Sequence, residues 1–270
     1  MKTKIYSAVT LLAATIVSMS FIQNKGKTML KEENVAYMAD GVALKGFVVY
    51  DENKAGKRPA VLVVHEWWGL NDYAKNRARQ LAELGYVAMA VDMYGDGKTA
   101  ANPQQAQEMA TPFYKDPQLS KTRLDAALKK LKTYKETDAT NVAAIGYCFG
   151  GSVVLNTAKL GADLKGVVSF HGGLTGVPAR KELLKAKILV CHGAADKFVS
   201  MQDVDAFKHA MDSIGADYTL KAYANATHAF TNPDATRIGK QFDMPIEYNA
   251  AADNASWIDM KNFLTGIFKK

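Results

Sequence analysis

The segment VAAIGYCFGGS, residues 142–152, decides the fold. Its first four residues are apolar and predict a strand buried on both faces, and the spacing that follows predicts a helix over 152–160. Between them lies the turn Gly-x-Cys-x-Gly, centred on Cys148. The two flanking glycines suit a turn so tight that a Cβ would collide with neighbouring backbone. Strand, turn and helix together match a nucleophile elbow, with sulfur in place of the usual serine oxygen.

On both sides of this segment, short apolar runs alternate with stretches of helical spacing. The alternation predicts an α/β fold with a mainly parallel sheet flanked by helices on both faces. No repeat, low-complexity tract or linker interrupts it, so residues 29–270 are expected to form a single domain. Strands are predicted at 42–50 (antiparallel), 60–64, 87–91, 142–145, 167–170, 188–190 and 218–222, and helices at 71–84, 118–137, 152–160, 201–214 and 250–268.

Cys148 has the sequence position of a nucleophile. The turn would lift its thiol clear of the sheet and place it at a helix N-terminus. There, partial positive charge favours the thiolate, and free N–H groups can receive an oxyanion. The alternative is a plain connection, since Gly-Cys-Gly turns also join strands to helices without chemistry. The pentapeptide alone leaves both interpretations open.

Two residues further along the chain are candidate partners for this thiol. Asp196 follows the strand predicted at 188–190, and His228 lies in the loop after the last predicted strand. Taken singly, Asp196 suits the cap of the next helix and His228 suits an exposed surface position. In parallel sheets, however, active sites lie beyond the carboxyl ends of the strands. The order nucleophile, acid, base on three such loops therefore favours a catalytic triad.

Four segments carry a specific resemblance: HEWWG at 65–69, GYCFGG at 146–151, HGAAD at 192–196 and HAF at 228–230. With them, the sequence from about Glu32 onward resembles the dienelactone hydrolase family of α/β-hydrolases. The resemblance implies the α/β-hydrolase fold and hydrolysis of small esters or lactones, without a cofactor, through an acyl-cysteine intermediate. It assigns the attack on the carbonyl to Cys148, the proton transfers to His228 and the orientation of the imidazole to Asp196.

The resemblance also assigns roles in the loop that carries HEWWG. Glu66 matches the family glutamate that contacts the resting thiol and swings away when substrate arrives. Such gating agrees with electrostatics, because a nearby carboxylate raises the pKa of a thiol. A solvated loop carboxylate is the alternative for Glu66. The backbone N–H groups of Trp67 and Phe149 would form the oxyanion hole.

The sequence departs from the family where dienelactone hydrolases hold the substrate carboxylate with arginines. The corresponding loops, 94–98 and 229–233, contain none, and the nearest cations are Lys98 and Arg237. A lysine does not reproduce a bidentate guanidinium clamp. Dienelactone itself is therefore not assigned as the substrate. The alternatives are a thioesterase or broad carboxylesterase, or a non-catalytic redox-sensing or binding protein on the same scaffold, with Cys148 oxidised rather than acylated.

Residues 1–24 predict a signal peptide. Lys2 and Lys4 precede an apolar run over 5–17, and Ser18 and Ser20 offer small side chains for cleavage near Ser20. The run is short for a membrane span, although an uncleaved anchor is the alternative. The mature protein is expected to be exported, either periplasmic or secreted, with no membrane association after cleavage.

Composition excludes several other classes. The formal charge of +7 is spread along the chain, and the lysines of 118–137 suit a solvated helix face, so we expect no nucleic-acid partner. Five histidines without metal-ligand spacing predict no metal site. His65, His171 and His192 are interpreted as packed or supporting residues. Cys148 and Cys191 are expected to remain free thiols. We expect a small ester or lactone as the only partner, and the oligomeric state does not follow from the sequence.

Overall fold

A single eight-stranded sheet organises the computed structural model, which describes Met1 and residues 28–268. The strand order is β1-β2-β4-β3-β5-β6-β7-β8. β1 and β2 form an antiparallel hairpin, β2 pairs antiparallel with β4, and the remaining strands run parallel. The strands are β1 (Leu30–Ala39), β2 (Val42–Asp51), β3 (Arg58–Val64), β4 (Val87–Val91), β5 (Thr137–Tyr147), β6 (Gly166–Phe170), β7 (Lys187–Gly193) and β8 (Tyr218–Tyr223).

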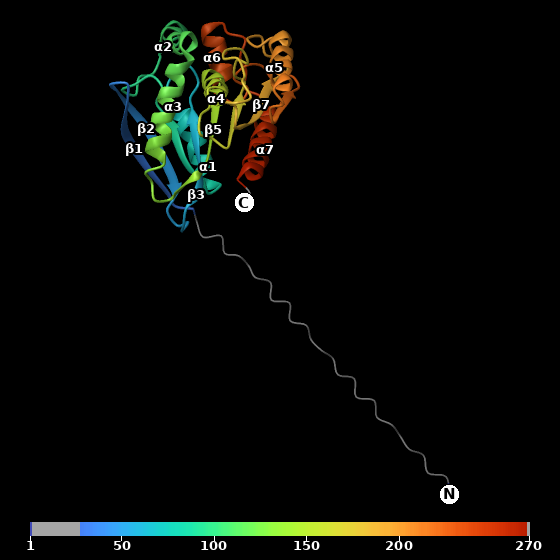
Figure 1. Ribbon diagram of the computed structural model, residues 1–270. Helices are drawn as coiled ribbons and strands as arrows, with labels where there is room; N and C mark the ends of the chain where they lie inside the picture. Colours follow the sequence, from blue (N-terminus) through green and yellow to red (C-terminus); the bar gives the residue numbers. More distant parts are fainter. Residues whose placement is uncertain (2–27, 269–270) are drawn as a thin grey trace.

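Helices cover both faces of this sheet (Figure 1). Alternate residues of β3 belong to two different clusters: the cluster of Leu62 includes residues of α3, α4 and α5, whereas the cluster of Val63 includes residues of α1 and α7. This is the period-two alternation of a strand buried on both sides. The helices are α1 (Asp72–Glu83), α2 (Pro103–Lys115), α3 (Pro117–Leu131), α4 (Phe149–Lys159), α5 (Met201–Ser213), α6 (Ala235–Phe242) and α7 (Ala250–Ile267). The predicted α/β-hydrolase class is confirmed.

Three elements are absent from the sequence prediction. β1 is an edge strand with charged residues, so its hydrophobic pattern is weak. α2 contains Pro112, which argues against a helix on sequence alone, and α6 has only eight residues. The helix predicted over 118–137 is also too long, because α3 ends at Leu131 and Thr137 already pairs with Arg58 of β3. Strand pairing overrides helical propensity at this point.

The loops after β3, β5, β7 and β8 bring the predicted site residues to the carboxyl end of the sheet. α2 and α6 lie at one end of the molecule in Figure 1, and residues of α2 and of the segment after α6 line the cavity described below. The predicted signal peptide lies outside the described residues. Within residues 28–268, no helix is long and apolar enough to cross a membrane.

Candidate active site

Cys148 occupies a strained elbow between β5 and α4. Its φ of 53° and ψ of −114° lie in a region that side-chain-bearing residues rarely adopt. The flanking glycines are required by close approach: a Cβ on Gly146 would overlap the carbonyl of Gly150, and one on Gly150 would overlap backbone of the loop after β3. The thiol is half-buried and free. The elbow predicted from the sequence is therefore present.

Backbone contacts join this elbow to the neighbouring loops. The N–H of Gly150 donates to the carbonyl of His65 at 3.1 Å, and the N–H of Cys148 donates to the carbonyl of Phe170 at 3.0 Å. The first bond fixes α4 against the loop that carries Glu66 and Trp67. The start of α4 and the loop after β3 are thus held as one rigid edge around the sulfur.

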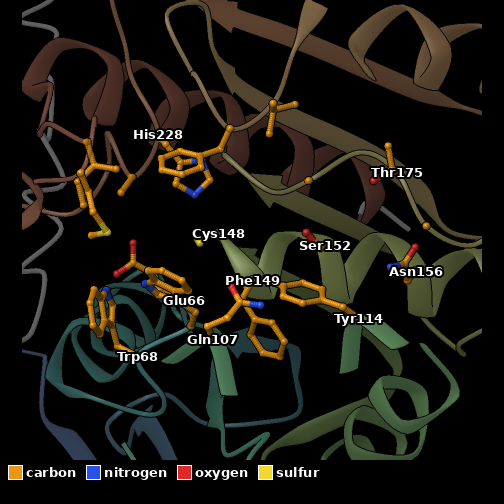
Figure 2. Close-up of a pocket in the computed structure, with 18 of the residues that line it drawn as sticks. Glu66, Trp68, Gln107, Tyr114, Cys148, Phe149, Ser152, Asn156, Thr175 and His228 are labelled. Atoms are coloured by element: carbon orange, nitrogen blue, oxygen red, sulfur yellow. The ribbon is translucent and has the colours of Figure 1, made fainter. Parts of the chain in front are cut away.

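His228 lies next to Cys148 and is oriented by Asp196. Nδ1 of His228 lies 2.8 Å from Oδ2 of Asp196, whose other oxygen accepts the N–H groups of Phe198 and Val199. Asp196 thereby directs the Nδ1 proton away from the sulfur and leaves Nε2 for the cavity side. The His228 ring faces the Cys148 sulfur in Figure 2.

The electrostatics of this histidine favour its protonated form. Burial by itself lowers the pKa of His228, but attraction to Cys148 and hydrogen bonding with Asp196 outweigh it and raise the pKa to about 10. Imidazolium is the form that stabilises a neighbouring thiolate. The structure therefore brings the three sequence-predicted triad residues together in an arrangement suited to thiolate chemistry.

Glu66 is buried at the edge of the same cavity and is not a solvated loop carboxylate. It is 3% exposed, and its Oε2 accepts a 2.7 Å hydrogen bond from Nδ2 of Asn232. Burial raises the pKa of Glu66 to about 7, although Asn232 and His228 oppose this shift. Its hydrogen bond goes to Asn232 rather than to the Cys148 thiol, so the predicted resting contact between Glu66 and the thiol stays a prediction.

One of the two backbone N–H groups predicted for the oxyanion hole lies at the start of α4, and the other lies in the loop after β3. The hydrogen bond from Gly150 to His65 joins these two segments. Phe149 is the first residue of α4, so its N–H has no partner within the helix. The peptide of Trp67 is held through its carbonyl, which accepts the hydroxyl of Tyr94 at 2.9 Å. Among the described residues, neither N–H has a hydrogen-bond acceptor. Both are thus free to receive a substrate oxygen.

A buried polar network extends behind the nucleophile. Nδ1 of His171 accepts the N–H of Cys148 at 3.1 Å, and its Nε2 lies 2.7 Å from Oγ1 of Thr231. The Tyr73 hydroxyl lies 2.7 Å from the same oxygen, and Arg77 donates to the Thr231 carbonyl. Burial lowers the pKa of His171 well below its usual range, so this imidazole stays neutral. It supports the elbow, in agreement with the supporting role predicted for it.

A cavity of about 570 Å³ opens over the sulfur. Figure 2 shows Glu66 and Trp68 on one side of Cys148, and Ser152, Asn156 and Thr175 on the other. The walls of the cavity come mainly from the loops after β3, β6, β7 and β8 and from α2 and α4. The lining residues are Glu66, Trp67, Trp68, Gln107, Tyr114, Pro117, Cys148, Phe149, Ser152, Asn156, Gly173, Thr175, Gly176, Phe198, Val199, His228, Ala229, Met244 and Ile246.

The sequence located this lining only in part. Trp67, Trp68 and Tyr114 line the cavity, whereas Phe113 and Phe230 are buried in the core. Asn232 and Thr231 were seen only as positions lacking arginine. No local pattern marks them, because their contacts with Glu66 and His171 span 166 and 60 residues of sequence.

The two candidate cations for a substrate carboxylate lie away from the cavity. Lys98 is exposed and is not a lining residue. Arg237 lines a second, neighbouring cavity, where its Nε bonds Asp234 at 3.2 Å. Within the described residues, no cluster of three or more His, Cys, Asp or Glu side chains is placed to hold a metal ion.

Comparison with known proteins gives one consistent group of relatives. The model of the dienelactone hydrolase family matches residues 33–268. Protein usf of Aquifex pyrophilus is 31% identical over 208 residues, which cover 73% of this chain and 86% of that protein. A Methylorubrum extorquens protein, provisionally named a carboxymethylenebutenolidase, is 30% identical over 66% of this chain and 65% of its own.

The chain is also similar to a solved structure. The crystal structure of a dienelactone hydrolase-like promiscuous phosphotriesterase from metagenomic libraries superimposes with a TM-score of 0.83. The two chains are 36% identical, and the match covers 89% of this chain and 99% of that one.

Proposed function

This chain belongs to the dienelactone hydrolase family and is a hydrolase acting on esters or lactones, and we propose that it works through a Cys148–His228–Asp196 triad and an acyl-cysteine intermediate. One observation carries the proposal: a thiol at a strained elbow lies beside a histidine whose Nδ1 is 2.8 Å from a buried aspartate. A structural thiol would need neither the strained φ nor the oriented imidazole.

The first half of the reaction forms the acyl-enzyme. The Cys148 thiolate attacks the ester carbonyl, and the carbonyl oxygen becomes an oxyanion that the N–H groups of Trp67 and Phe149 receive. One such donor contributes roughly 3 kcal/mol to the transition state. The imidazolium of His228 then gives its proton to the leaving alcohol as the C–O bond breaks.

The second half releases the acid. Neutral His228 takes a proton from water, the resulting hydroxide attacks the thioester carbonyl, and the C–S bond breaks to restore the thiolate–imidazolium pair. Asp196 keeps the imidazole in one tautomer throughout. Glu66 acts in the resting enzyme, where a swing toward Cys148 would disfavour a second negative charge on the sulfur and protect the thiol.

The test is hydrolysis of short 4-nitrophenyl esters combined with trapping of the intermediate. Cys148→Ala should abolish turnover, and His228→Ala should lower kcat/KM by roughly 10³-fold or more. Acid quenching of the wild type should leave one acyl group on the peptide containing Cys148. The matched controls are Cys191→Ala, which removes the other thiol, and His209→Ala on the exposed face of α5.

Two outcomes would defeat the proposal. Equal rates in wild type and Cys148→Ala would exclude the nucleophile. An acyl group on any other residue would exclude the mechanism, even with activity retained. A thiol that is oxidised by peroxide but never acylated would favour the redox-sensing alternative.

We further propose that the protein is exported, on the sequence pattern of residues 1–24. Basic Lys2 and Lys4, the apolar run over 5–17 and the small residues Ser18 and Ser20 support a cleaved signal peptide. N-terminal sequencing of protein recovered from the periplasm or medium should find a terminus shortly after Ser20. An intact Met1 terminus in the cytoplasm would contradict export.

A further inference from the structure

The walls of the cavity over Cys148 contain very few ionisable side chains. Outside the reacting pair Cys148 and His228, Glu66 is the one lining residue with an acidic or basic side chain, and none of the lining residues, all in the described part of the chain, is Lys or Arg. The remaining surface is aromatic, aliphatic or neutral polar. A carboxylate on the substrate would therefore meet no cation here and would face the carboxyl of Glu66.

The buried cation Arg77 is committed elsewhere. Arg77 lies behind Glu66, 7% exposed, where its guanidinium bonds Asp253 at 2.6 Å and the carbonyl of Thr231 at 2.6 Å. Turning it toward the cavity would take the guanidinium away from the half-buried carboxylate of Asp253 and from the carbonyl of Thr231. Arg77 is thus not available to an anionic group in the cavity, and an unpaired buried charge is strongly disfavoured.

Neutral hydrogen-bonding groups instead follow α4 away from the nucleophile. Ser152 and Asn156 are one helical turn apart and lie on the same side of Cys148, opposite Glu66 (Figure 2). Oδ1 of Asn156 is fixed by the N–H of Val177 at 3.1 Å. Among the described residues, Nδ2 of Asn156 and the hydroxyl of Ser152 have no hydrogen-bond partner. They are available to a carbonyl, amide or hydroxyl group of a substrate.

We infer that this site takes uncharged esters, with one arm of the substrate running along α4 to Ser152 and Asn156, and that it rejects esters carrying a carboxylate. The inference rests on the proposed function, because it names the substrate class of the same thiol. An apolar body enters between the aromatic walls, and a neutral polar group at its end meets the hydroxyl and the amide. A substrate carboxylate is rejected because no lining residue offers it a positive charge and because the carboxylate of Glu66 repels it.

A matched pair of substrates tests this inference. 4-Nitrophenyl 4-carboxybenzoate and 4-nitrophenyl 4-carbamoylbenzoate have the same shape and leaving group, and differ in one charge. Each kcat/KM is divided by the hydroxide-catalysed rate of the same ester, which removes differences in intrinsic reactivity. The carbamoyl ester should be preferred by at least about tenfold, because only the carboxylate leaves a charge unpaired.

Variants of this chain separate charge from shape. Gln107, on α2 at the cavity wall, is exposed. Gln107→Arg should raise the rate ratio of carboxylate ester to carbamoyl ester by about fivefold or more, whereas Gln107→Met should not. Ser152→Ala should lower kcat/KM for the carbamoyl ester by about two- to tenfold relative to unsubstituted 4-nitrophenyl benzoate, as loss of one neutral hydrogen bond predicts.

The outcomes distinguish this inference from the proposed function. Equal normalised rates for the two esters, or preference for the carboxylate, would overturn the substrate class while leaving the triad in place. If wild type hydrolyses neither faster than Cys148→Ala, nor any simple 4-nitrophenyl ester, the proposed function fails and the inference with it.

Discussion

Replacing Glu66 by glutamine should stabilise the fold at alkaline pH and change little in acid. Burial raises the pKa of Glu66 from its ordinary 4.5 to about 7. Below pH 4.5 the carboxyl is protonated in both the folded and the unfolded chain, so burial carries no ionic penalty. As pH rises from 4.5 to about 7, the unfolded chain releases this proton while the folded chain keeps it, so stability is lost over that interval and the loss is complete above it.

The pKa difference sets the size of this loss. At about 1.4 kcal/mol for each pKa unit, the interval from 4.5 to about 7 corresponds to roughly 3 kcal/mol above pH 8. Glutamine has the same shape, keeps an oxygen to accept the Nδ2–H of Asn232, and carries no charge. The Glu66→Gln variant should therefore be more stable than wild type by roughly 3 kcal/mol at pH 8.5, and by less than about 1 kcal/mol at pH 5.

Urea unfolding followed by far-UV circular dichroism measures both values. Glu83→Gln, an exposed substitution on α1, is the matched control and should change stability by less than about 0.5 kcal/mol at either pH. A difference between Glu66→Gln and wild type that is equal at pH 5 and pH 8.5 would refute the reasoning, because a shape effect does not titrate.

Three other substitutions test the supporting structure. Asp196→Asn should lower kcat by roughly 10³-fold or more while the unfolding free energy changes little, because the imidazole adopts the wrong tautomer; steady-state kinetics measure it. Gly146→Ala should destabilise by about 3 kcal/mol or prevent folding, since its Cβ meets backbone, whereas Gly266→Ala, with open space around it, should not destabilise. Arg77→Leu should cost about 2 kcal/mol or more in urea unfolding, because it takes the guanidinium away from the half-buried Asp253 and from the carbonyl of Thr231.

The sequence predicted the role of a residue correctly where that role depends on its immediate neighbours in the chain. The elbow around Cys148 is specified by two glycines and a strand-to-helix change, all within one short segment. Asp196 and His228 were predicted because parallel topology brings strand ends together, and the structure places their side chains in contact. Periodicity likewise identified the buried strands, since a strand buried on both faces is continuously apolar.

Sequence reasoning failed where a role depends on a distant partner. The partner of Glu66 is 166 residues away, and an asparagine following a histidine carries no sign of that contact. The end of α3 was misplaced because pairing of Thr137 with Arg58, across the sheet, decides it. Which residues line the cavity also depends on distant contacts: Phe113 and Tyr114 are adjacent in sequence, yet Phe113 is buried in the core and Tyr114 lines the cavity.

The residue that hydrogen-bonds Glu66 bears on two proposals at once: the gating role predicted for Glu66 and the class of substrate. An arginine in the segment after His228, as in dienelactone hydrolases, would hold the pKa of a neighbouring carboxyl well down and would offer a cation to a substrate carboxylate. Asn232 supplies one neutral N–H donor instead, so burial prevails and the pKa of Glu66 stays about 7. The side chain of Asn232 also adds no positive charge next to Glu66. With Asn232 in this position, the pKa of Glu66 is about 7, and the segment after His228 brings no arginine to an uncharged ester of the kind we infer as substrate.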